Sequence, residues 1–326
     1  MAIDILNIQP SVVSRDLKGK YVAIYGKEKV GKTSFAASFP KNLILAFEVG
    51  TNALSGIRAQ KIEKWADFRM VLRQLEKPEA KAMYDTITID TVSIAWDLCE
   101  AYVCAQNGVQ KISDIAWGAG YTACKKEYES CLRKITMLGY GIVLISHQTS
   151  RIEKTGDGSE IEILSPDIPK RAKEIINQLV DIIGYIGVEW NENGESIRYL
   201  YTRQTPTIMA GSRFKYLAPK IKFGYAELVN AISDAIDAYE KYDGASVVDS
   251  IEREESVQVN FYDLRAEAQE LWKRLVGEGD NVNPEMAQTI AKRVEMIFGH
   301  PMKISEITED QVSLMELVVE EMKDLL

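Results

Sequence analysis

Residues 21–34 read YVAIYGKEKVGKTS, and this stretch decides the fold class. A β-prone run at 21–25 leads into a glycine-rich loop, and a helix-prone run, SFAASF, follows. Four residues satisfy the pattern GxxxxGK(S/T): Gly26, Gly31, Lys32 and Thr33. The glycines let backbone N–H groups turn toward phosphate oxygens, the helix presents its positive end to them, and the lysine adds a charge. The stretch therefore predicts a strand, a phosphate-binding loop and a helix that bind a nucleotide.

Such a site also needs a metal ligand. The run TITID at 86–90 predicts an apolar strand ending in Asp90, where a carboxylate can hold Mg²⁺ together with the Thr33 hydroxyl. Capping the helix that follows is an alternative role for Asp90, compatible with the first. ATP and Mg²⁺ are thus the expected cofactors, with Thr33 and Asp90 as metal ligands. The residues expected around the nucleotide are Gly26, Lys27, Glu28, Lys29, Val30, Gly31, Lys32, Thr33 and Ser34.

Strands and helices alternate on both sides of this loop. The β-prone runs lie at 21–25, 42–47, 86–90 and 141–146, and helical patterns lie at 66–75, 93–105 and 117–137, the last after the expected cap Ser113 or Asp114. This alternation predicts an α/β fold with a parallel central sheet covered on both faces.

The pattern changes after residue 150. A Gly-Asp-Gly turn within 151–169 predicts a protruding hairpin or mobile loop. The elements expected next are a helix at 171–180, antiparallel strands at 182–190 and 196–204 that extend the sheet, and a helix at 225–242. We therefore expect an ATPase core at 1–242, an acidic linker at 243–260 and a small all-α domain at 261–326, with helices at 262–276, 284–298 (Asn283 as its cap) and 309–326.

Composition limits the classes of protein that remain. With 326 residues, 46% of them apolar and 27% charged, the chain is globular and not disordered. It has no apolar run long enough for a membrane helix, so we expect a cytoplasmic protein without a membrane partner. Residues 242–326 contain 8 basic and 19 acidic residues, whereas residues 1–241 contain 31 and 29. The acidic tail therefore favours a protein partner, or a role in solubility, over direct contact with nucleic acid.

The cysteines and histidines do not suggest a metal centre. Two histidines, His147 and His300, lie far apart in the sequence, and no pair of cysteines has CxxC spacing, so zinc is not expected. The sequence predicts reduced, buried thiols at Cys99, Cys104, Cys124 and Cys131.

Further features narrow the class of ATPase. We expect the strand at 42–47 to be the one inserted between the phosphate loop and Asp90 in the parallel sheet. Glu48 follows this strand, His147 and Gln148 follow the strand at 141–146, and AGSR occupies 210–213. Together with the phosphate loop, these features resemble the phage-encoded RecA-like P-loop ATPases of the single-strand annealing and recombination group, over about residues 15–241. The resemblance implies a RecA-like core, a homo-oligomer and ATP-dependent handling of single-stranded DNA in the cytoplasm of a bacterial host.

The resemblance also implies roles for single residues. Glu48 would orient and deprotonate the attacking water. His147 or Gln148 would sense the γ-phosphate and relay its state to the next loop, and a structural role is the alternative for this pair. Arg213 or Lys215 would reach the γ-phosphate of a neighbouring subunit. The catalytic residues expected are therefore Lys32, Glu48, Asp90, His147 and Gln148.

Two segments are candidates for DNA contact. The loop at 149–173 contains five basic and five acidic residues and no aromatic residue, so a solvated hairpin is an equal alternative. The segment 202–225 combines cations with aromatic residues and has no acidic residue, which fits phosphate or single-strand contact, although a solvated basic turn is the alternative. Its members are Arg203, Arg213, Lys215, Lys220, Lys222, Phe214, Tyr216, Phe223 and Tyr225.

Three functions compete at this point. The first is a Mg²⁺-dependent ATPase acting on single-stranded DNA in recombination or strand annealing, with a single-strand-binding protein as a possible partner of the C-terminal helices. The second is a non-catalytic annealing scaffold that holds ATP as a structural ligand. The third is a P-loop kinase for a small molecule, although the sequence shows no compact arginine-rich lid. Apolar stripes in the C-terminal helices most simply pack these helices together.

Overall fold

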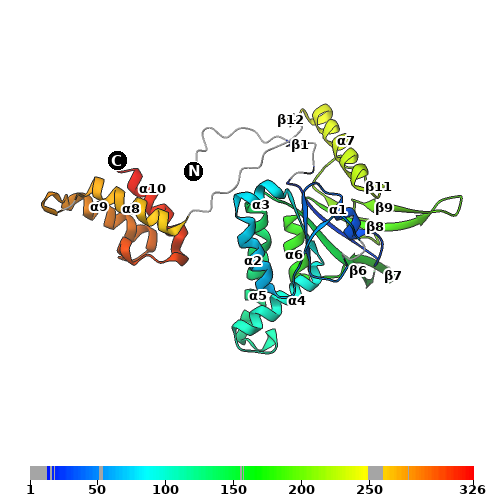
Figure 1. Cartoon of the computed structure of the whole chain (residues 1–326), viewed down its shortest axis with the longest axis horizontal. Coiled ribbons are helices and arrows are strands. Elements are labelled where there is room, and N and C mark those ends of the chain that lie inside the picture. Colours follow the sequence, from blue (N-terminus) through cyan, green and yellow to red (C-terminus); the bar gives the residue numbers. More distant parts are fainter. Residues whose placement is uncertain are drawn as a thin grey trace. The chain divides into compact units, whose positions relative to one another are not determined.

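The computed structural model describes residues 13–14, 17, 19–50, 54–154, 156, 158–248, 260–277 and 279–326. These residues fall into two compact units, one within Pro10–Glu255 and one within Ser256–Leu326 (Figure 1). The larger unit is α/β, and the described part of the smaller unit contains only helices and the turns between them. The predicted fold class is therefore confirmed.

A ten-stranded sheet forms the centre of the larger unit. Its strands are β2 (Tyr21–Gly26), β3 (Asn42–Ala46), β4 (Arg58–Lys61), β5 (Thr86–Asp90), β6 (Gly141–Lys154), β7 (Glu160–Pro166), β8 (Ile182–Trp190), β9 (Ser196–Tyr201), β10 (Gly211–Ser212) and β11 (Lys220–Lys222). The order across the sheet is β11-β9-β8-β2-β6-β5-β3-β4, with β7 paired to β6 and β10 paired to β8. Neighbours from β8 to β4 run parallel, and the other pairs run antiparallel.

The predicted insertion of the 42–47 strand between the phosphate-loop strand and the Asp90 strand is wrong. Although β3 precedes β5 in the chain, the strand that lies between β2 and β5 is β6, and β3 pairs with the other edge of β5. A parallel strand is reached through a crossover connection, so neighbours along the chain need not be neighbours in the sheet. This order places β6 directly beside the strand that leads into the phosphate loop.

Helices cover both faces of the sheet (Figure 1). One face packs against α2 (Trp65–Leu75), α4 (Val92–Gln106), α5 (Ala119–Met137) and α6 (Lys170–Leu179), and the other packs against α1 (Lys32–Ala37) and α7 (Tyr225–Asp243). Each face has its own apolar core, which explains why the central strands are apolar at nearly every position. All four cysteines are free and buried in the first core.

Several local predictions need correction. The short helix α3 (Pro78–Met83) buries none of its residues, so it has no apolar stripe that the sequence could reveal. Gly118, not Ser113 or Asp114, caps α5, because residues 112–114 form a separate 3₁₀ turn. β12 (Val247–Val248) pairs with β1 (Val13–Ser14), so these two residues of the expected linker belong to the larger unit. The rest of that linker, from 249 to 259, lies outside the described residues.

The smaller unit consists of three helices around a separate apolar core. They are α8 (Phe261–Leu275), α9 (Pro284–Phe298) and α10 (Val312–Lys323). The Asn283 side chain accepts a hydrogen bond from the Met286 N–H at 3.1 Å, which confirms the predicted cap of α9. In the part of the chain that the structure describes, no helix combines the length and apolar character needed to cross a membrane.

Candidate nucleotide-binding and catalytic site

Three strands bring polar side chains to the phosphate loop. Asp90 ends β5, Glu48 follows β3, and His147 lies within β6 next to Gly26 of β2. Side chains alternate between the faces of a sheet, and the parity of each strand places these three on the face that packs against α1. The sheet therefore gathers, at the carboxyl ends of its parallel strands, groups that are far apart in the sequence.

The phosphate loop encloses the Lys32 side chain. Its Nζ donates hydrogen bonds to the carbonyl oxygens of Gly26, at 3.0 Å, and Lys27, at 2.8 Å, and the residue is 6% exposed. Burial lowers the pKa of Lys32, and the negative charge of Asp90 acts against this shift, as does that of Glu48. Gly31 has φ +104°, a conformation that favours glycine and explains the second glycine of the motif.

Thr33 and Asp90 form the candidate metal site. The Thr33 Oγ1 donates to Asp90 Oδ2 at 2.7 Å. Burial raises the pKa of Asp90, whereas the Thr33 hydrogen bond lowers it. No side chain caps the start of α4, so the Asp90 carboxylate accepts from Thr33 and does not cap the helix. Hydroxyl and carboxylate oxygens fit Mg²⁺, which binds through one or two protein groups together with water and phosphate oxygens.

That coordination mode agrees with the protein donors available. No cluster of three or more His, Cys, Asp or Glu side chains suited to a metal occurs among the described ranges. The Thr33–Asp90 pair therefore suits a cation that is shared with nucleotide phosphates rather than one enclosed by protein alone.

His147 connects Glu48 with Lys32. Its Nε2 lies 3.0 Å from Glu48 Oε2, and its Nδ1 lies 3.5 Å from Lys32 Nζ. Because an ammonium group only donates, the ring satisfies both contacts when Nδ1 accepts and Nε2–H donates to the carboxylate. The Glu48 backbone N–H donates to the carbonyl of Asp90 at 3.1 Å, so backbone and side chain together fix the position of this carboxylate beside the loop.

The structure separates the two residues that the sequence could not tell apart. His147 contacts the loop lysine, whereas Gln148 follows it on the opposite face of β6 by strand alternation. Gln148 Oε1 is buried and makes no hydrogen bond with the described part of the chain. Of this pair, the structure brings only His147 to the phosphate loop.

Arg198 on β9 also contacts the loop, and the sequence analysis missed it. Its guanidinium donates to the Val30 carbonyl at 2.9 Å and lies over the Phe223 ring, 5.4 Å from the ring centre. The C=O and N–H of a trans peptide point in opposite directions, so this bond turns the Gly31 N–H away from Arg198. No sequence signal marked this contact, because Arg198 is exposed on β9 and an exposed arginine in a strand is ordinary.

Replacing Arg198 by alanine should weaken ATP binding about tenfold, since a charge-assisted hydrogen bond that orients the loop is lost. Arg198→Lys keeps the charge without the planar group, so its ATP affinity should lie between that of Arg198→Ala and that of the unmodified chain. Titration of a fluorescent ATP analogue measures the affinity, and thermal unfolding checks that the fold survives. An unchanged affinity in Arg198→Ala would show that the contact has no role in positioning the loop.

Most cations of segment 202–225 contact carboxylates or carbonyl oxygens of the same chain. Arg213 pairs with Asp181 at 3.1 Å, and Lys215 pairs with Asp243 at 3.0 Å. The remaining contacts link Lys220 to Glu189, and Arg203 to the carbonyls of Phe214 and Lys215. The aromatic residues of the segment pack partly buried against the core on the α1 and α7 face. Thus the structure gives most of this segment a folding role, and a role in trans for Arg213 and Lys215 stays a prediction.

Comparisons with known proteins give a family, a relative and a solved structure. The family model described as an AAA domain matches residues 18–214. A SPbeta prophage-derived uncharacterized protein, YorG, from Bacillus subtilis strain 168 is 30% identical over 338 aligned positions, which cover 100% of this chain and 99% of that protein. The solved structure of the flagellar accessory protein FlaH from Methanocaldococcus jannaschii matches with a TM-score of 0.35 and 13% identity, over 64% of this chain and 85% of that chain.

Proposed function

We propose that this chain, which belongs to the AAA domain family of P-loop ATPases, hydrolyses ATP with Mg²⁺ and couples hydrolysis to single-stranded DNA. One observation supports catalysis above the others. Glu48, Lys32 and His147 form a connected group at the phosphate loop, with the Glu48 carboxylate held by the histidine that contacts the loop lysine.

Each group has a distinct task in this mechanism. The loop N–H groups and Lys32 bind the phosphate oxygens and offset the charge that spreads over them in the transition state. Mg²⁺, held by Thr33 and Asp90, would neutralise further phosphate charge. Glu48 accepts a proton from the attacking water, and His147 orients the Glu48 carboxylate through the Nε2 contact.

The continuity of β6 supports coupling to DNA. The strand runs without interruption from Gly141 to Lys154, so His147 at the site and Arg151 on the β6–β7 hairpin belong to one element. The β6–β7 pairing extends for seven residues beyond the site, from Gln148 with Pro166 to Lys154 with Glu160. A change of contacts at His147 on hydrolysis would therefore act on the strand that forms the hairpin.

The biological setting is inferred from the prophage-derived relative and from the resemblance of the sequence to phage-encoded RecA-like ATPases. The match to a prophage-derived protein over the whole of this chain supports a phage origin. We therefore propose that the activity serves phage-type recombination or strand annealing. The protein would act as a homo-oligomer, in which Arg213 or Lys215 leaves its carboxylate partner in the same chain and contacts the γ-phosphate bound to a neighbouring subunit.

Long unstructured single-stranded DNA should stimulate steady-state ATP hydrolysis several-fold, and raising the salt should reduce the stimulation, because phosphate contacts depend on counterion release. The measurement uses Mg²⁺ and ATP, with and without DNA, at two salt concentrations. Double-stranded DNA of equal length is the control.

The other results separate the competing functions. Turnover that no DNA changes would contradict the coupling while leaving the ATPase assignment intact. ATP binding without turnover under any of these conditions would favour the scaffold function.

A further inference from the structure

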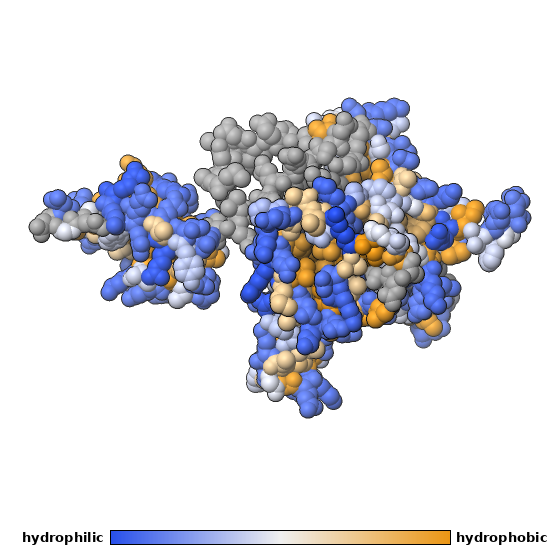
Figure 2. Space-filling model, viewed as in Figure 1, coloured by the Kyte–Doolittle hydropathy of each residue, from blue (hydrophilic) through white to orange (hydrophobic). Residues whose placement is uncertain are grey.

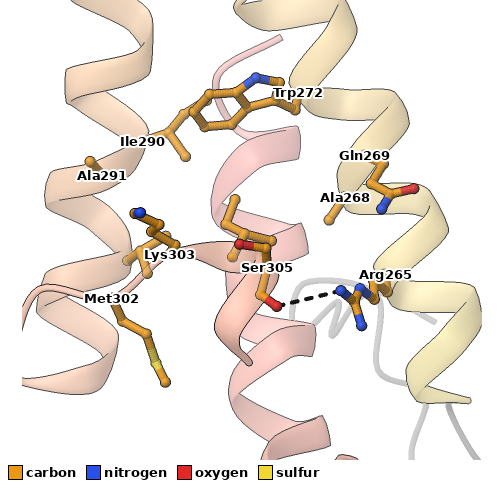
Figure 3. Close-up of a pocket in the computed structure, with 11 residues that line it drawn as sticks. Arg265, Ala268, Gln269, Trp272, Ile290, Ala291, Met302, Lys303 and Ser305 are labelled. Atoms are coloured by element: carbon orange, nitrogen blue, oxygen red, sulfur yellow. Dashed lines mark hydrogen bonds between the residues drawn. The ribbon is translucent and has the colours of Figure 1, made fainter. Parts of the chain in front are cut away.

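The helical unit contains a groove that the ATPase site does not use. A cavity of about 360 Å³ lies between α8, α9 and the segment around residues 302–305 (Figure 3). Its walls are largely apolar, with Trp272 from α8, Ile290 and Val294 from α9, and Met302 from the following segment. This volume lies within the range of about 300–1,000 Å³ that is typical of clefts for small ligands and side-chain anchors.

The groove is elongated along α8. Arg265 and Trp272 line it two helical turns apart, and Figure 3 shows their side chains toward opposite ends. Seven residues at 1.5 Å of rise correspond to about 10 Å. Three residues of an extended peptide span a similar distance, so one polar and two apolar residues can lie along the groove together.

Two cations without carboxylate partners line the groove. In the described ranges Arg265 makes one hydrogen bond, a long one of 3.4 Å to the Ser305 carbonyl, and neither its guanidinium nor the Lys303 ammonium forms an ion pair, although the Glu306 carboxylate accepts from the Lys303 backbone N–H at 3.1 Å. Elsewhere in the unit Arg293 pairs with Glu321, and Lys323 pairs with Glu267 and Glu320. The groove thus combines apolar walls with two cations that are available for an anion.

Two cations beside apolar walls are unusual within this acidic helical unit. Residues 261–326 contain 14 acidic and 7 basic residues, and the visible face of the unit is mostly hydrophilic (Figure 2). At physiological salt, charges beyond about 8 Å are largely screened, so Arg265 and Lys303 favour an anion in the groove, and the nearby Glu306 carboxylate is the charge that opposes this preference. A nucleic acid would extend its phosphates over that acidic surface, and a second copy of the unit would bring like charges together.

We propose that this groove binds a short peptide segment of a partner protein in which an acidic residue lies next to large apolar residues. The carboxylate pairs with Arg265, Lys303 on the other side of the groove adds positive charge, and the apolar side chains pack against Trp272, Ile290 and Met302. The unit would then recruit the ATPase to its partner, and this function does not depend on hydrolysis.

Selection from a random octapeptide display library on the full chain tests the proposal. Enriched peptides should pair Asp or Glu with Leu, Ile, Phe, Trp or Met. Fluorescence anisotropy with the best labelled peptide then measures affinity. The double variant Arg265→Glu/Lys303→Glu should weaken binding at least about tenfold, because attraction becomes repulsion. The control Arg274→Glu/Lys292→Glu makes the same charge change at exposed cations outside the groove and should leave binding unchanged.

A second pair of variants does not alter charge. Ala291 is exposed and lines the groove, so Ala291→Trp should fill it and abolish binding, whereas Ala266→Trp, at an exposed position outside the groove, should not. Thermal unfolding verifies that each variant is folded. No enrichment, enrichment without acidic residues, or peptide binding that Ala291→Trp leaves intact would overturn the proposal. Self-association of the full chain that Ala291→Trp abolishes would overturn it in favour of a second copy.

Discussion

Lys32→Ala should lower the rate constant of ATP hydrolysis by about 100-fold or more, because it removes a buried positive charge from the position where negative charge develops. The effect should be large since Lys32 is fixed by two loop carbonyls and is 6% exposed, so no other cation can take its position without rearranging the loop. Phosphate release measured at saturating ATP reports the loss.

The control for this variant is Lys41→Ala, which removes the same charge from an exposed lysine that pairs with Asp85 at 3.6 Å. It should hydrolyse ATP at the rate of the unmodified chain. Thermal unfolding of both variants separates loss of the fold from loss of function. A folded Lys32→Ala variant that turns over ATP normally would refute the assignment of the phosphate loop.

Glu48→Gln should keep ATP affinity within a few-fold and lower turnover by about 100-fold to 10,000-fold, the usual contribution of a general base. Glutamine keeps the size of the side chain and a carbonyl oxygen to accept from His147 Nε2, but it does not take a proton from water. Affinity comes from titration with a fluorescent ATP analogue, and the hydrolysis rate comes from single-turnover measurements.

Glu63→Gln provides the matched control, since it neutralises an exposed carboxylate that pairs with Lys61 away from the loop. It should change neither affinity nor turnover. His147→Ala should reduce turnover less than Glu48→Gln does, because the histidine positions the carboxylate and leaves the proton acceptor in place. Hydrolysis by Glu48→Gln at the normal rate would rule out proton transfer to Glu48.

Much of the fold could be predicted because its signals are local. The strand and helix flanking the phosphate loop, the cap at Asn283 and the hairpin turn after β6 each depend on a few consecutive residues. The sequence analysis missed elements with no buried face, such as α3, and pairings between distant segments, such as β1 with β12. Neither leaves a periodic pattern in the sequence.

The candidate site was predictable in its residue types but not in its geometry. His147 and Gln148 are adjacent, and a shift of one residue in strand register exchanges the face each of them occupies. Only the pairing of Gly26 with His147 decides between them. Arg198 comes from a strand far along the chain, and its contact with Val30 depends on β9 reaching the loop through β8.

The length of β6 has a mechanical consequence. From His147 to Lys154 the strand continues for seven residues, which at about 3.4 Å each is roughly 24 Å. Paired with β7, this arm is held to the core at Leu164, which lies opposite Ser150 and bonds to Thr207 and Met209 at 2.8 and 3.0 Å. The part beyond Ser150 spans four residues, about 14 Å. A tilt of about 10° at Ser150 would displace Lys154 by roughly 2 Å over that length. A rearrangement at the phosphates that tilted the arm would therefore move the end of the hairpin by about half the spacing between neighbouring strands.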